Sequence, residues 1–110
     1  MTKLPTHIDF YVPTLVALNN YGGSANIDEI NDAIIANMGL SQAQLDTVYP
    51  KSGVPILPDR MSWARSYLKY PGLLSNSARG VWTLTEEGRA AVNWPADKVK
   101  SVVSAAANAD

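Results

Sequence analysis

The chain has 110 residues, 46% of them hydrophobic and 17% charged, and a formal net charge of −1, which fits one folded domain and excludes a disordered or strongly polyionic protein. It contains no cysteine, which excludes disulfides, thiolate metal sites and a cysteine nucleophile. The N-terminal segment has no apolar stretch typical of a signal peptide, and no window is apolar enough for a membrane span, so we expect a cytoplasmic protein that does not bind membranes.

The first part of the chain predicts two helices. Apolar residues recur at three- and four-residue steps from Ile8 to about Asn20, although Pro13 either ends a short N-terminal turn near Val12 or kinks this helix. A second helix is expected between the cap Asn26 and Gly39. Its apolar residues, which we expect to face the core, are Ile27, Ile30, Ile34, Ile35 and Met38.

A short helix and a loop precede the third long helix. Ser41 can cap a brief helix that runs to Asp46, and the prolines and glycine between Tyr49 and Pro58 predict a loop or an extended connector. The third long helix is expected from Arg60 to about Tyr70, because Asp59 can open it and a Pro-Gly pair ends it. Its predicted core side holds Met61, Ala64, Tyr67 and Leu68 with Trp63 at the border, and its opposite side holds Ser62, Arg65, Ser66 and Lys69.

A β-hairpin and a short helix are expected next. The β-prone segments 73–75 and 81–84 are joined by residues 76–80, in which Asn76 and Gly80 suit a turn. Thr85 can cap a helix that runs to about Val92. We therefore predict one domain over residues 1–94, followed by residues 95–110 as a weak extra helix, a linker or a frayed tail.

This order of elements predicts an α+β, mainly helical fold of the winged helix-turn-helix type. It would have a three-helix core, a two-stranded hairpin as the wing, and a C-terminal helix. In such domains the helix before the hairpin enters the major groove of DNA, and the hairpin loop contacts the backbone or the minor groove. The predicted partner is duplex DNA, bound through the helix 59–70 and the wing 73–84.

The distribution of charge favours this prediction, although a net charge of −1 does not by itself suggest nucleic-acid binding. Residues 1–50 contain one lysine and five acidic residues, a net −4, whereas residues 51–80 contain five basic residues and one aspartate, a net +4. A chain with segregated charge can present a basic face to phosphates. We expect phosphate contacts from Arg60, Lys69 and Arg79 and base-edge contacts from Ser62, Arg65 and Ser66. A solvated helix face beside an ordinary hairpin is the alternative.

A spaced pattern of residues runs through the same region. It comprises Arg60, Trp63-Ala64, Leu68, Gly72-Leu73, Ser77, Arg79-Gly80, Trp82, Leu84-Thr85 and Gly88. This pattern resembles the N-terminal winged helix domain of Mrr-type restriction proteins, and the resemblance spans roughly residues 4–94. It implies a DNA-recognition role for the helix 60–70 and for the wing around Ser77 to Gly80. In that family the domain delivers DNA to a C-terminal nuclease domain of the PD-(D/E)xK type, in systems that often restrict methylated DNA.

No catalytic constellation is visible in this chain. Pro58-Asp59 begins the nuclease motif, but no acid-x-Lys follows, and two residues rather than one separate Asp97 from Lys100. Asp28 and Asp32 share a helix side and are expected to be solvated, and His7 has no partner at a catalytic or metal-binding spacing. We therefore expect no catalysis, no metal and no cofactor.

The sequence thus predicts the DNA-binding module of a restriction system, acting with an attached or separate nuclease domain or as a homodimer. Two other functions stay open. One is a stand-alone winged helix transcriptional regulator, and the other is a protein-interaction module that dimerises through its hairpin and valine-bearing tail. Trp63 and Trp82 either stack on bases or pack the wing onto the helix.

Overall fold

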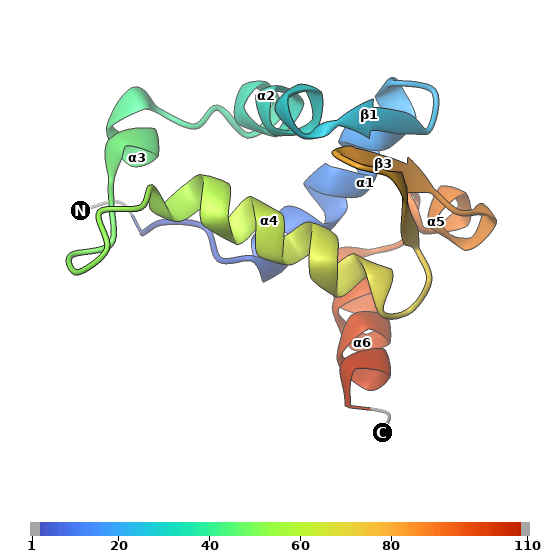
Figure 1. Cartoon of the computed structure of the whole chain (residues 1–110). Coiled ribbons are helices and arrows are strands. Elements are labelled where there is room, and N and C mark those ends of the chain that lie inside the picture. The colour runs from blue at the N-terminus through green and yellow to red at the C-terminus, as the bar shows by residue number, and fades with distance from the viewer. Residues whose placement is uncertain (1–2, 109–110) are drawn as a thin grey trace.

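The computed structural model describes residues 3–108, apart from the side chain of Ser77. Its elements are η1 (Ile8–Phe10), α1 (Tyr11–Asn20), β1 (Ser24–Asn26), α2 (Ile27–Met38), α3 (Gln42–Asp46), α4 (Ile56–Lys69), β2 (Leu74–Ala78), β3 (Val81–Leu84), α5 (Glu86–Ala91) and α6 (Ala96–Ala107). In Figure 1 the strands lie at one side of the molecule near α1 and α5, α2 and α4 extend away from them, and α6 points downward. The predicted α+β, mainly helical class is confirmed.

The sheet has three antiparallel strands in the order β1-β3-β2. The predicted hairpin corresponds to β2 and β3, but its predicted loop over residues 76–80 is wrong, because β2 continues to Ala78 and Asn76 lies within that strand without a positive φ. An extra residue in β2 between Ser75 and Ala78 forms a β-bulge. Gly80 supplies the positive φ of 75° that its turn needs. The third strand, β1, places Ala25 opposite Trp82 and was not predicted.

Local signals in the first half of the chain explain where the helices begin and end. Pro13 lies in the first turn of α1, where the missing N–H is tolerated, so a separate turn, η1, ends at Phe10 and precedes the helix. Asn26 and Glu29 form a capping box at the start of α2. Gly39 ends α2 in the left-handed conformation, with φ 64°.

The apolar side of α2 is only partly as predicted. Ile30 and Ile34 are fully buried and Ile35 and Met38 are partly buried. Ile27, however, is 37% exposed, so the expectation that it faces the core is wrong. It is the first residue of α2, and the helix end lies at the rim of the core.

The connection to α4 is shorter than predicted. Ser41 caps the brief helix α3 as expected. The predicted loop is wrong at its end, because α4 begins at Ile56 rather than near Arg60. Pro58 lies in the first turn of α4 and does not interrupt it. Ile56 and Leu57 are buried, which explains why the helix starts there.

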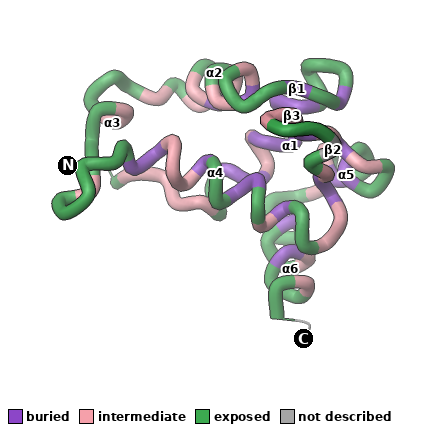
Figure 2. Tube along the Cα trace, in the orientation of Figure 1, coloured by how far each residue is buried: buried purple, intermediate pink, exposed green. Residues whose placement is uncertain are grey.

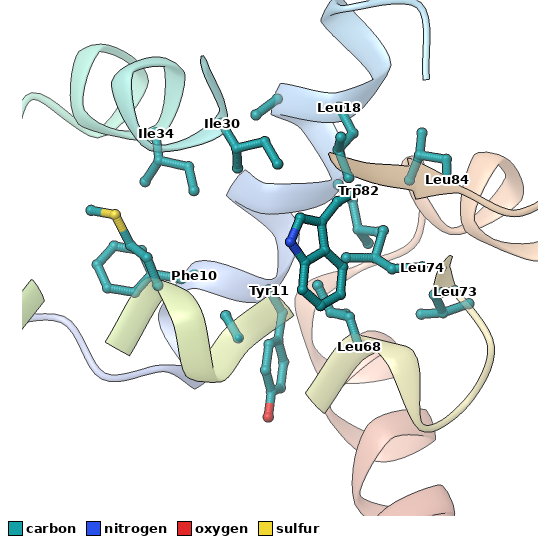
Figure 3. Close-up of a cluster of buried hydrophobic side chains, with 14 of the residues drawn as sticks. Phe10, Tyr11, Leu18, Ile30, Ile34, Leu68, Leu73, Leu74, Trp82 and Leu84 are labelled. Carbon is teal, nitrogen blue, oxygen red and sulfur yellow. The ribbon is translucent and has the colours of Figure 1, made fainter. Parts of the chain in front are cut away.

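One continuous core joins α1, α2, α4, the sheet and α6. Figure 2 shows buried segments on all of these elements, and Figure 3 draws part of the cluster. For residues 95–110 the sequence predicts a weak extra helix, a linker or a frayed tail. The structure shows a twelve-residue helix, α6, whose Val99 and Val103 are 0% and 2% exposed within this core.

Candidate nucleic-acid interface

The outer side of α4 carries small polar and basic side chains. Ser62, Ser66 and Lys69 are exposed, and at about 100° per residue they lie within about 60° of arc. On the other side of the helix Leu57, Met61, Ala64 and Leu68 are 0% exposed. Of the predicted core side, Met61, Ala64 and Leu68 are confirmed, whereas Tyr67 is only partly buried and Trp63 is exposed. The predicted exposure of Ser62, Ser66 and Lys69 is confirmed.

Arg65 does not share that exposure. Only 4% of its surface is accessible, its Nη1 donates to Asn31 Oδ1 at 2.9 Å, and its Cζ lies 6.0 Å from the ring centre of Trp82. Burial lowers the pKa of the Arg65 guanidinium. The expectation that Arg65 lies on the outer side of α4 is wrong, because Asn31 of α2 and Trp82 of β3 flank the helix there.

Arg60 is also separated from the outer side of α4. It is half-buried, and its Nη1 donates to the backbone oxygen of Pro5 at 2.9 Å. It lies nine positions before Lys69, which places the two on opposite sides of the helix, about 180° apart. Arg60 therefore ties the N-terminal segment to α4, and the structure does not bring it together with Ser62, Ser66 and Lys69.

The neighbouring loop is fixed at the same end of α4. The Tyr49 hydroxyl donates to Asp59 Oδ2 at 2.9 Å. This hydrogen bond, with some desolvation and the negative charge of Asp59, raises the pKa of Tyr49, although Arg60 opposes the shift. The start of α4 is thus fixed by contacts within the chain.

The hairpin β2–β3 lies beside α4, because β2 contacts this helix. Arg79 is exposed in the turn between the two strands, as the sequence suggested. The side chain of Ser77 lies outside the described part of the structure. The structure therefore leaves two exposed basic residues, Lys69 and Arg79, on α4 and its neighbouring hairpin.

A hollow of about 540 Å³ lies at the C-terminal end of α4. It is lined by Ser66, Lys69, Tyr70 and Trp82, and among residues 3–108 no carboxylate belongs to this lining. Tyr70 is 64% exposed and was missed by the sequence analysis, which treated it only as the end of the helix. Its three-residue spacing from Tyr67 and seven-residue spacing from Trp63 would have pointed to a shared side of the helix.

An aromatic side, formed by His7, Trp63, Tyr67 and Tyr70, runs along α4 next to the serines. Trp63 is 52% exposed and stacks on Tyr67 with ring centres 5.9 Å apart. Tyr67 in turn stacks on His7 at 5.0 Å. Of the two alternatives for the tryptophans, packing of the wing onto the helix fits Trp82, which is 8% exposed within the core (Figure 3). It does not fit Trp63, which is exposed.

The acidic residues of α2 that the sequence analysis considered lie on the protein surface. Asp28 and Asp32 are both exposed on α2. Within residues 3–108, no group of three or more histidine, aspartate or glutamate side chains is arranged to hold a metal ion. None of the helices in that range is long and apolar enough to cross a membrane.

Most of this sequence is similar to known protein sequences. The family model described as the Mrr N-terminal domain matches residues 8–93. The "Type IV methyl-directed restriction enzyme EcoKMrr" of Escherichia coli (strain K12) is 32% identical over 85 residues, which cover 77% of this chain and 28% of that enzyme. No solved structure matches the chain. The chain therefore spans 28% of the length of this curated relative.

Proposed function

Because the chain belongs to the Mrr N-terminal domain family, we propose that it is the DNA-binding module of a restriction system and that it binds duplex DNA in the cytoplasm. One observation carries the proposal. Ser62, Ser66 and Lys69 are exposed together on α4, and the adjoining hairpin exposes Arg79. Short polar side chains permit close approach to DNA, and the two cations can neutralise phosphates.

The topology supports a winged helix-turn-helix as the fold behind this function. The helix α4 is followed directly by the hairpin β2–β3, and β1 completes the sheet on the far side of β3. In winged helix domains the helix in this position enters the major groove, and the wing reaches the neighbouring backbone. We assign Ser62 and Ser66 to the groove, and Lys69 and Arg79 to phosphates, with Ser77 as a further wing contact.

We assign the cleavage of DNA in this restriction system to a nuclease domain outside the matched region. The relative is named as a restriction enzyme, and the similar region covers 28% of it. This chain would then position DNA and supply no catalytic residue of its own. The same titration with unmethylated and methylated duplexes would show whether the "methyl-directed" property of the relative extends to this domain.

A matched pair of variants tests the proposal by fluorescence anisotropy with a labelled duplex at low salt. Ser66→Glu places a negative charge on the proposed face, whereas Ser101→Glu places the same charge on the exposed surface of α6. We expect Ser66→Glu to weaken binding at least about tenfold, because a carboxylate on the DNA-facing side of α4 would enter the negative potential of the duplex; tenfold corresponds to about 1.4 kcal/mol. Ser101→Glu should change binding little. Equal effects of the two variants, or no binding by the wild type, would contradict the proposal.

The aromatic side favours self-association as a second candidate function. Trp63 and Tyr70 are 52% and 64% exposed, which is unusual for large aromatic residues and typical of protein contacts. A second copy would also extend the short DNA site that one winged domain can read. Sedimentation of wild type and Trp63→Ser tests this candidate: a dimer that dissociates in the variant supports it, and a wild-type monomer at high concentration excludes it.

A further inference from the structure

Arg65 is a buried cation without a carboxylate partner among the described residues. It is 4% exposed, it donates to a neutral amide, Asn31, and its Nε has no hydrogen-bond partner in that part of the chain. Buried charges in proteins are normally paired, because taking an ion out of water is costly. Within the described residues, the positive charge of Arg65 therefore meets only the neutral Asn31 amide and the Trp82 ring, and no carboxylate.

A second unused donor lies against this cation. The indole ring of Trp82 faces the Arg65 guanidinium with a ring-to-Cζ separation of 6.0 Å. Its Nε1 is buried and, within the described residues, has no acceptor. Buried N–H groups usually find an acceptor. Two neighbouring donors thus lack one, which indicates that this part of the molecule is short of acceptors and of negative charge.

The hollow described above adjoins this pair through Trp82, which belongs to its lining, whereas Arg65 lies behind the lining and is buried. Its other lining residues supply an ammonium group from Lys69 and hydroxyl groups from Ser66 and Tyr70. Such a set offers donors and positive charge and carries no carboxylate. The major-groove edge of guanine also presents acceptors only, but a phosphate carries in addition the negative charge that this set lacks.

We propose that this hollow is a phosphate-binding subsite, in which Ser66, Lys69 and Tyr70 hold one phosphodiester of the DNA backbone at the C-terminal end of α4. The subsite deepens the proposed function and rests on it for the source of the phosphate. It reassigns Ser66 from the base edges to the backbone. Arg65 is a positioning residue: it contacts the ring of Trp82 without lining the hollow, and it adds positive potential through an interior in which charge is poorly screened.

The indole N–H signals of the three tryptophans allow a direct test. A ¹⁵N-labelled chain is titrated with inorganic phosphate, with chloride at equal ionic strength as the reference, and in a second arm with a short duplex. We expect the Trp82 indole signal and the amide signals of residues 66–70 to shift in both arms, while the Trp94 indole signal stays in place. A Trp82 shift no larger than that of Trp94 would overturn the subsite.

Lysine variants separate the subsite from the wider function. Lys69→Gln should abolish the phosphate-induced shift and weaken duplex binding about fivefold or more, whereas Lys100→Gln on α6 should leave both unchanged. If Lys69→Gln binds phosphate and duplex like the wild type while Ser62→Glu blocks duplex binding, the subsite is wrong and the DNA-binding function stands. If phosphate shifts Trp82 but no duplex binds, the subsite stands and the source of its phosphate is not DNA.

Arg65→Met tests the role of the buried charge. Because it replaces an unpaired buried cation with an apolar side chain of similar length, we expect an unchanged or raised Tm together with about fivefold or greater weakening of duplex binding. Arg65→Lys, which keeps the charge, should restore part of the binding. A fall in Tm with unchanged duplex affinity would show that Arg65 is purely structural. If Arg65→Met does not fold, the phosphate titration of Lys69→Gln decides.

Discussion

Gly88 allows a close approach between α5 and the strand-side backbone, and its replacement by alanine is a sharp test of how the wing is seated. A Cβ at this position would overlap the carbonyl oxygen of Leu73 and lie 3.2 Å from Leu84 Cδ2. The same carbonyl accepts hydrogen bonds from the backbone N–H and the hydroxyl of Thr85, each at 3.1 Å. Moving it would therefore disturb both contacts that hold α5 to the start of β2.

The expected magnitude follows from opposing terms. Alanine gains about 1 kcal/mol over glycine in a helix. Against this stand two weakened hydrogen bonds, at about 1 kcal/mol each, and an overpacking cost of about 1–3 kcal/mol. The net loss of unfolding free energy is about 2–4 kcal/mol, which for a chain of this size lowers the Tm by about 8–16 °C.

Differential scanning calorimetry or thermal circular dichroism measures this loss. Glu87→Ala is the matched control, because Glu87 is the exposed neighbour of Gly88 in the same helix, and it should change the Tm by only a few degrees. A Gly88→Ala variant with a wild-type or higher Tm would refute the reasoning. The gain in helix propensity would then exceed the cost of the clash between the new Cβ and the Leu73 carbonyl oxygen.

Three further predictions follow from other contacts. Asn26→Ala removes the capping box of α2 and should lower the free energy of unfolding by about 1 kcal/mol in urea titration, against Asn37→Ala as an exposed control on that helix; equal midpoints would contradict it. Burial and the nearby Tyr67 raise the pKa of Tyr11, so the contribution of Tyr11 to the free energy of unfolding should be constant below its unfolded pKa near 10 and should fall as the pH rises further. In alkaline unfolding experiments Tyr11→Phe should lessen this loss of stability. An identical loss in the variant would show that other groups cause it. Arg79→Ala should reduce the slope of log K against log salt for duplex binding by about 0.9, the share of one phosphate, and an unchanged slope would remove the wing from the interface.

The sequence was most informative where local rules determine structure. The cap at Asn26, the glycine at the end of α2 and the turn before β3 depend on single residues and their immediate neighbours, and all were predicted. By contrast, β1 consists of three residues paired with residues of β3 that lie 55 or more positions later. So short a segment carries no alternating pattern of its own, and the pairing is visible only in the folded chain.

The candidate site shows the same division. The outer positions of Ser62, Ser66 and Lys69 follow from helical periodicity alone. Arg65 could not be placed in this way, because periodicity does not reveal that α2 and β3 cover a further part of the helix surface. The contact of Arg60 with Pro5 depends on how the N-terminal segment returns to α4, which also has no local signature.

DNA binding through α4 and the hairpin β2–β3 is tested most directly by mapping the amide chemical-shift changes of a ¹⁵N-labelled chain when it binds a short duplex. We predict that the largest changes occur at residues 62–70, in α4 and at its C-terminal end, and at residues 78–80 of the hairpin, and that these changes become smaller as salt is added. Changes centred on α6 or on the acidic start of α2, or no change at low salt, would contradict it.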